Sequence, residues 1–230
     1  MNRKNEISGI LLVNKAQGST SFSLVTALRK RTNVSKIGHA GTLDPFATGV
    51  MVMLIGRKYT KQSNLFLSED KSYYGKIHLG KSTDTFDIDG KIIQTSEKVP
   101  TDTEVDQILE RFQGKQEQIP PMYSAKKKNG KKLYELARKG ITIERAPVQI
   151  QVEIEKIEYH YPFLEVKIHC SKGTYIRSLA DDIGNALGCG GHLVSLTRLS
   201  SGPFQLKDCV EEADVRNTQF DLLPVIRQER

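Results

Sequence analysis

Residues 148–170 read VQIQVEIEKIEYHYPFLEVKIHC, and this stretch decides the fold class. Apolar and polar residues alternate from Val148 to Glu155 and again from Leu164 to Cys170. Alternation puts every second side chain on the same face, which is typical of a β-strand with one buried face. We expect these runs to belong to two half-buried strands joined by a short connection across residues 159–162.

Helical patterns lie on both sides of these strands. Thr101 and Glu104 have capping-box spacing, and apolar residues follow at positions 105, 108, 109 and 112. After Gly173, apolar residues at positions 176, 179, 183 and 187 predict another helix, which Gly188 ends. Paired strands between separate helices predict an α+β fold with a mixed, largely antiparallel central sheet flanked by helices.

The N-terminal part adds further core segments. Residues 9–13 read as a short apolar strand, and a Gly-Ser-Thr-Ser cluster at 18–21 supplies N-cap oxygens for a helix. Residues 50–55 are an unbroken apolar run, which predicts a strand buried on both faces or a short buried helix. Since no Pro/Gly/Ser-rich linker divides the chain, we expect one continuous domain over residues 1–230.

The net charge of +7 is concentrated in one segment. Seven basic residues and one acidic residue fall between Met122 and Gly140: Lys126, Lys127, Lys128, Lys131, Lys132, Arg138 and Lys139, against Glu135. One interpretation is a solvated lysine-rich loop. The other is an arm that contacts phosphates, whose affinity would fall with salt through counterion release.

Several common classes of site are missing from the sequence. There is no phosphate-binding G-x-x-x-x-G-K-[ST] motif, and the five histidines have no metal-ligand spacing. Residues 87–90 resemble the middle of a calcium loop, but Thr85 stands at the first ligand position, so we interpret them as a turn. We therefore predict no metal and no nucleotide cofactor.

The location of the protein follows from similar observations. No apolar run approaches the roughly 20 residues that span a bilayer, and the N-terminal apolar stretch is too short for a secretory signal. The three cysteines have no C-x-x-C spacing, which fits a reducing compartment. We predict a cytoplasmic protein with no membrane partner.

A loop around Asp44 could carry chemistry. Residues 38–49 read GHAGTLDPFATG, with three glycines and with Pro45 restricting the backbone of Asp44 directly before a core strand. The Asp-Pro pair either starts an ordinary turn or holds a carboxylate in place as a nucleophile or base. The second role requires a cationic partner that keeps the carboxylate ionised.

Arg177 is a candidate for that partner, because residues 171–177 lead from a strand into a helix whose N-terminus favours anions. Its alternative partner is Asp181 at i+4, although basic-before-acidic is the weaker orientation. Tyr73 and Tyr74 lie on opposite faces of a predicted strand, so one belongs to the core and the other could stack on a base. Taken alone, His39 is interpreted as a loop histidine with satisfied hydrogen bonds.

Four motifs now occur in a specific order: GHAGTLDPFATGV at 38–50, KSYYGKIHLGKSTDTFDIDG at 71–90, PPMYSAKKKNGKKLYELARKG at 120–140 and HCSKGTYIRSLADDIG at 169–184. Together they resemble the bacterial TruB family of tRNA pseudouridine synthases over most of residues 9–200. The resemblance implies the pseudouridine synthase fold. It also implies isomerisation of uridine 55 in the T loop of tRNA to pseudouridine, by base flipping and an aspartate nucleophile, without metal or cofactor.

The resemblance also assigns roles to residues. Asp44 is the expected nucleophile and Arg177 its charged partner. Tyr73 is the expected catalytic ring that stacks on the flipped uracil and assists removal of the C5 proton. The remaining expected substrate contacts are Tyr175 and Leu196 in the base pocket, His39 in the space left by the extruded nucleotide, and Lys126, Lys127, Lys131 and Lys132 in an RNA-gripping insertion at about residues 120–145.

Two departures from the family pattern are visible. The first motif, usually K-P-x-G-x-T-S, reads KAQGSTS at residues 15–21, and the missing proline affects only the local loop, since the resemblance carries no catalytic role there. Family members commonly continue into an RNA-binding PUA domain, but only 28 residues follow Gly202. We therefore expect a monomeric catalytic domain without a PUA domain, with the tRNA T-arm as its partner.

Two other functions remain open at this point. One is a related enzyme that modifies a different structured RNA. The other is an RNA-folding or RNA-binding protein whose catalysis is incidental. The complete set of Asp44, Tyr73 and Arg177 argues against a purely binding role.

Overall fold

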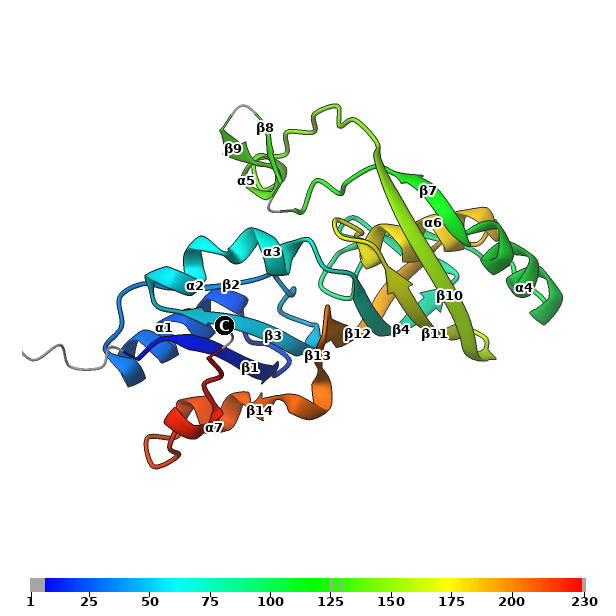
Figure 1. Ribbon diagram of the computed structural model, residues 1–230. Helices are drawn as coiled ribbons and strands as arrows, with labels where there is room; N and C mark the ends of the chain where they lie inside the picture. Colours follow the sequence, from blue (N-terminus) through cyan, green and yellow to red (C-terminus); the bar gives the residue numbers. More distant parts are fainter. Residues whose placement is uncertain (1–6, 125, 129, 229–230) are drawn as a thin grey trace, which may run out of the picture. The chain divides into compact units, whose positions relative to one another are not determined.

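The computed structural model describes residues 7–124, 126–128 and 130–228, which form two compact units (Figure 1). Among the described residues, the first unit comprises 7–73 and 196–228, and the second comprises those between 74 and 195. Both boundaries fall inside strands, β4 (Lys71–Leu79) and β12 (Gly191–Ser201). A boundary inside a strand leaves no Pro/Gly/Ser-rich linker, which explains why the composition of the sequence indicates one continuous domain.

The first unit is built on a sheet with strand order β14-β1-β3-β12, where β2 also pairs with β3 and β13 with β12. Its elements are β1 (Gly9–Lys15), α1 (Ser21–Thr32), β2 (Ile37–His39), β3 (Thr48–Ile55), α2 (Arg57–Lys61), α3 (Ser63–Leu67), β13 (Phe204–Gln205), β14 (Val210–Glu211) and α7 (Glu212–Arg216). The β1–β14 and β3–β12 pairs are parallel, and the other pairs are antiparallel.

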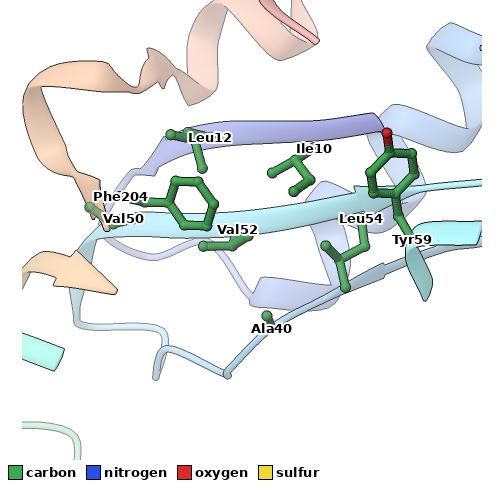
Figure 2. Packing of buried hydrophobic residues seen from close by; sticks show 8 residues of the cluster. All are labelled: Ile10, Leu12, Ala40, Val50, Val52, Leu54, Tyr59 and Phe204. Atoms are coloured by element: carbon green, nitrogen blue, oxygen red, sulfur yellow. The ribbon is translucent and has the colours of Figure 1, made fainter. Parts of the chain in front are cut away.

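The core of the first unit lies along β1 and β3. All residues from Val50 to Ile55 are fully buried, which confirms the predicted strand with two buried faces. Figure 2 shows one cluster of this core, which contains Ile10, Leu12, Ala40, Val50, Val52, Leu54, Tyr59 and Phe204. Phe204 belongs to β13, so residues late in the chain complete a core that begins at β1.

The second unit contains a sheet with strand order β4-β11-β10-β7. Its elements are β5 (Lys81–Thr83), β6 (Ile92–Thr95), α4 (Asp102–Arg111), β7 (Gly114–Gln118), β8 (Lys127–Lys128), β9 (Lys131–Lys132), α5 (Leu133–Ala137), β10 (Val148–His160), β11 (Phe163–Cys170) and α6 (Ile176–Ala186). Strand β10 pairs antiparallel with both β11 and β7. Two further antiparallel pairs, β5–β6 and β8–β9, stand apart from this sheet.

The sequence patterns of the second unit are confirmed. The two alternating runs form the antiparallel pair β10–β11, with the alternate apolar side chains buried. Helix α4 begins with the predicted capping box, in which Thr101 and Glu104 each bond to the other's backbone N–H. The largely antiparallel, mixed strand pairing and the flanking helices confirm the α+β class.

Helix α1 follows the predicted N-cap cluster, where Thr20 accepts a hydrogen bond from Ser23 N–H. Val25 and Leu28 are buried on this helix, whereas Phe22 is 62% exposed. No helix in the described part of the chain is long and apolar enough to cross a membrane.

Candidate functional site

Asp44 lies at the first position of a β-turn in the first unit. Its carbonyl accepts a hydrogen bond from Ala47 N–H at 3.1 Å, and Pro45 occupies the second position, which this kind of turn favours. Leu43 and Phe46 are buried on either side, while Asp44 is partly exposed. The turn therefore presents a carboxylate at the surface of a loop that is anchored in the core.

The KAQGSTS segment holds both neighbours of Asp44. The Ser21 hydroxyl donates to Leu43 O and accepts from Leu43 N–H, both at 2.9 Å. On the other side, Pro45 O accepts from Gly18 N–H at 2.8 Å and from Lys15 Nζ at 3.3 Å. Sequence analysis assigned this segment only a local role, because the pattern alone does not show that it folds against the Asp44 turn.

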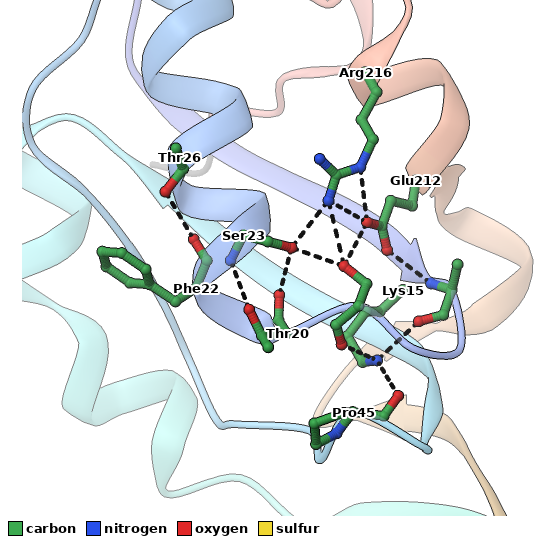
Figure 3. Close-up of polar contacts among 10 residues, drawn as sticks. Lys15, Thr20, Phe22, Ser23, Thr26, Pro45, Glu212 and Arg216 are labelled. Carbon is green, nitrogen blue, oxygen red and sulfur yellow. Dashed lines mark hydrogen bonds and ion pairs between the residues drawn. The ribbon is translucent and has the colours of Figure 1, made fainter.

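Lys15 and Glu212 brace the same segment from within (Figure 3). Lys15 Nζ also donates to Ala16 O and Ser19 O, and Glu212 accepts from Ala16 N–H at 2.9 Å and from the Ser19 hydroxyl at 2.6 Å. Burial lowers the pKa of Lys15 to about 8, against the opposing effect of the Glu212 and Asp44 charges. A buried ammonium group thus stands close enough to interact with the carboxylate of the turn.

Arg198 holds the two ends of the Asp44 loop and was not singled out by sequence analysis. Its buried guanidinium donates from Nε to Val50 O at 2.7 Å and from Nη2 to Gly41 O at 3.3 Å. Gly49 pairs with Arg198 in the sheet, and a Cβ there would lie 2.3 Å from Arg198 O. Only glycine allows this approach, which explains one of the three glycines in the loop.

The structure does not support the interpretation of His39 as a loop histidine whose hydrogen bonds are all satisfied. It ends strand β2, and its Nδ1 is buried with no hydrogen-bond partner among the described residues. Burial, and then the positive charge of Arg198, lower the pKa of His39, so the neutral ring is favoured. Leu196 is buried on β12, where its carbonyl accepts a long hydrogen bond from the Thr48 hydroxyl.

The two tyrosines at the start of β4 face opposite sides, as predicted. Tyr73 is 7% exposed, and Tyr74 is partly exposed with its hydroxyl hydrogen-bonded to Glu165. Lys76 pairs with the same carboxylate at 2.9 Å. Tyr73 is thus the more buried member of the pair, and Tyr74 belongs to a polar cluster with Glu165 and Lys76.

Arg177 is buried in the second unit and is held by partners far away in the sequence. Its Nη1 donates to Asp87 Oδ2 at 3.1 Å and to Thr85 O at 3.0 Å, and its Nη2 donates to Tyr123 O at 2.6 Å. The alternative partner, Asp181, instead accepts from Asn185 Nδ2 at 3.0 Å. The i+4 pairing considered from the sequence is therefore wrong.

Asp87 is the residue that sequence analysis undervalued. Residues 84–90 form the predicted turn, and Asp87 Oδ1 accepts from the Thr85 hydroxyl at 2.6 Å and from Asp89 N–H at 3.1 Å. These bonds leave Oδ2 directed at Arg177. The turn therefore presents a buried carboxylate to a buried arginine, which the sequence spacing of a calcium-like loop could not indicate.

The basic segment begins close to this arginine. Lys126 is exposed, and the backbones of β8 and β9 pair Lys127 with Lys132 and Lys128 with Lys131. The side chains of Lys127, Lys131 and Lys132 lie outside the described residues. Among the residues that the structure describes, no group of three or more His, Cys, Asp or Glu residues is placed to hold a metal ion.

The predicted site residues thus fall into two sets, which we describe separately. His39, Asp44, Tyr73 and Leu196 belong to the first unit, and Tyr175, Arg177 and the lysines belong to the second. The first set centres on a carboxylate in a braced turn. The second centres on a buried guanidinium and on Tyr175, which directly precedes helix α6.

Comparison with family models covers most of the chain. The TruB family pseudouridylate synthase N-terminal domain matches residues 29–176, and the tRNA pseudouridylate synthase B C-terminal domain matches residues 177–222. The second match includes β13, β14 and α7, which complete the first unit.

Curated relatives extend over nearly the whole chain. A protein named tRNA pseudouridine synthase B from Protochlamydia amoebophila is 56% identical over 211 residues, which are 92% of this chain and 80% of the relative. One of the same name from Chlamydia abortus is 55% identical over 95% of this chain and 93% of its own length. A third, from Francisella philomiragia, is 44% identical over 96% and 73%.

Solved structures are similar in fold. A Cbf5-Nop10-Gar1 complex contains a chain with a TM-score of 0.70 and 29% identity, covering 90% of this chain and 53% of that chain. An H/ACA RNP bound to a substrate RNA containing 2'-deoxyuridine gives a TM-score of 0.66 at 27% identity, with 90% and 51% covered. The present chain thus spans about half the length of these solved chains.

Proposed function

Because the chain belongs to the TruB family of pseudouridylate synthases, and is therefore an enzyme of the isomerase class, we propose that it converts uridine 55 in the T loop of tRNA to pseudouridine. Asp44 is the nucleophile in this proposal. The reaction breaks the N-glycosidic bond of the uridine and rejoins the base through C5, so no atom is gained or lost. The tRNA T-arm is the binding partner.

The bracing of Asp44 is the observation that carries the proposal. A nucleophilic carboxylate must be ionised and held in one direction before the substrate arrives. Ser21, Gly18 and Lys15 fix the residues on both sides of Asp44, while its own side chain stays partly exposed. This arrangement fits a reacting group better than the start of an ordinary turn.

The other residues keep the roles that the resemblance implies. Arg177 supplies the positive charge that keeps the nucleophile ionised, and its buried, fixed guanidinium supports this role. Tyr73 stacks on the extruded uracil, whose unstacking from the loop costs a few kcal/mol that aromatic contacts offset. Tyr175 and Leu196 line the base pocket, and His39 fills the space that the nucleotide leaves.

His39 has a physical feature that suits this task. Its buried Nδ1 has no hydrogen-bond partner among the described residues, and a lowered pKa keeps the ring neutral. A neutral ring with an unused polar atom can exchange protein surroundings for those of RNA without moving a charge. This supports a contact with the T loop.

The basic segment at about residues 120–145 grips the tRNA backbone through Lys126, Lys127, Lys131 and Lys132. The support for this role is its net positive charge and the exposed Lys126. We further propose that the enzyme acts in the cytoplasm as a monomer, and that neither a metal nor a nucleotide cofactor takes part.

The direct test combines a chemical variant with a binding variant. Purified wild-type protein and unmodified tRNA transcript are expected to give pseudouridine at position 55, mapped by mass spectrometry. Asp44→Asn is expected to slow product formation by at least about 10³-fold. Lys127→Glu with Lys131→Glu is expected to raise KM more than it lowers kcat and to flatten the salt dependence.

Asp221→Asn is the matched control, because Asp221 is an exposed aspartate of the same unit that only caps a turn. Wild-type levels of pseudouridine from Asp44→Asn would contradict the proposed nucleophile. Modification at another position would favour the related enzyme of different specificity. Complementation of a growth defect by inactive Asp44→Asn would favour the RNA-folding function.

A further inference from the structure

Gln118 fixes the backbone of Tyr175 across 57 positions of the sequence. Its side chain is 2% exposed at the end of β7. Gln118 Oε1 accepts from Tyr175 N–H at 2.8 Å, and Gln118 Nε2 donates to Tyr175 O at 3.0 Å. A single carboxamide thus satisfies the donor and the acceptor of one residue.

This pairing defines the orientation of the amide. If the side-chain oxygen and nitrogen were exchanged, donor would face donor and acceptor would face acceptor. Gln118 is buried, so leaving its carboxamide without partners would be costly. Gln118 therefore sets where the chain enters α6, at a residue whose own side chain supplies no N-cap hydrogen bond.

The chain leaving Gln118 also reaches Arg177. Pro120 and Pro121 are buried and restrict the backbone, and two residues later Tyr123 O accepts from Arg177 Nη2 at 2.6 Å. The segment from Gln118 to Tyr123 thus contacts the first residue before α6 and the guanidinium two residues further on. Gln118 and Tyr123, which make these two contacts, belong to one stretch of chain that leads into the basic segment.

We propose that Gln118 is a positioning residue for the reaction, acting through Tyr175. This inference rests on the proposed function, because Tyr175 matters for turnover only if it lines the base pocket. Gln118 does not itself touch the substrate. It holds the Tyr175 ring in the position that receives the uracil, so its loss affects turnover more than tRNA binding.

The activity test uses Gln118→Met, which keeps the length of the side chain and removes both hydrogen bonds. Single-turnover and steady-state assays on tRNA transcript are expected to show kcat lowered about 10-fold, with KM within about twofold of wild type. In a Tyr175→Ala background the same change is expected to alter kcat by less than about twofold, because the ring that Gln118 positions is already gone.

Gln116→Met is the matched control. Gln116 lies on the same strand, and its Nε2 donates to the Arg111 and Gln113 carbonyls, away from Tyr175. It is expected to leave kcat unchanged. An equal loss from Gln118→Met in the wild-type and Tyr175→Ala backgrounds would overturn the inference, since it would indicate a general structural role.

A second measurement needs no activity. The chain has no tryptophan, so Tyr175→Trp places a single fluorescent reporter at this position. Adding Gln118→Met is expected to shift its emission to longer wavelength and to raise acrylamide quenching about twofold, because a released ring is more exposed to water. Adding Gln116→Met is expected to change neither.

The two measurements separate the failure of the inference from that of the proposed function. If wild-type protein makes no pseudouridine in tRNA, the proposed function fails, and the fluorescence still reports whether Gln118 holds Tyr175. If wild-type protein is active and Gln118→Met matches it in both kcat and fluorescence, the inference is overturned.

Discussion

Asp44 and Arg177, one in each unit, are held in place by different means. The Asp44 turn is fixed through its neighbours, because Ser21 bonds to the backbone of Leu43 and Lys15 to that of Pro45. Arg177 is fixed through its own side chain, which donates to a carboxylate and to two backbone carbonyls. The loop that carries Asp44 is anchored through contacts of the neighbouring residues, and the Arg177 guanidinium is held by direct hydrogen bonds.

The difference predicts where substitutions act. Removing a brace of the Asp44 turn leaves buried backbone groups without partners, so the cost falls on stability. Under the proposed function, removing a partner of Arg177 changes the direction and the electrostatic surroundings of a charge in the site, so the cost falls on the rate. Three variants test this contrast.

Asp87→Asn has the largest expected effect. The change keeps the shape of the side chain and removes the negative charge beside Arg177. Because a small misplacement of a reacting constellation can cost two orders of magnitude, we expect kcat to fall about 100-fold while tRNA affinity stays within about twofold. Single-turnover kinetics and filter binding measure the two quantities. Asp89→Asn, at an exposed position of the same turn, serves as control. An equal fall in kcat from Asp89→Asn would contradict a specific role of Asp87.

Ser21→Ala has an intermediate expected effect, on stability. It removes the hydroxyl that satisfies both Leu43 N–H and Leu43 O in a buried site, which is expected to cost about 1–3 kcal/mol in the free energy of unfolding. Urea denaturation gives this value. Thr26→Ala removes a hydroxyl on the exposed face of α1 and is expected to cost no more than about 0.5 kcal/mol. Equal costs for the two variants would contradict the bracing of the turn.

Lys15→Met has the smallest expected effect, which depends on pH. The folded pKa of Lys15 is about 8, below the ordinary value of 10.5, because of burial. Between pH 8 and pH 10.5 the unfolded chain holds a proton that the folded chain has released, so this group makes the free energy of unfolding rise with pH. The variant lacks that contribution. Its stability relative to wild type should fall across this range in urea titrations, and a constant difference would show that Lys15 does not titrate as described.

Local patterns predicted much of the fold. The alternation in residues 148–170 fixes which faces of β10 and β11 are buried, and the Thr101–Glu104 spacing marks the start of α4. These features depend on residues a few positions apart, where periodicity and capping determine the structure. The motifs around Asp44 and Arg177 likewise identified the family.

Long-range contacts could not be predicted in the same way. Gln118 and Tyr175 are 57 positions apart, and Asp87 and Arg177 are 90 apart. No spacing rule joins such residues, because the packing of the sheet brings them together. Asp87 also belongs to a sequence that is typical of a turn. The local sequence therefore indicated the turn but not the buried ion pair with Arg177.

The return of the chain to its first strand has a consequence for synthesis on the ribosome. Strand β14 pairs with β1, and Glu212 bonds to the loop that follows β1, across 196 positions. The second unit is one continuous segment, so all its residues emerge before β13, β14 and α7 have been made. Domains generally fold in the order in which they emerge. The bracing of the Asp44 turn therefore depends on residues made late, and it cannot be complete until nearly all of these 230 residues have been translated.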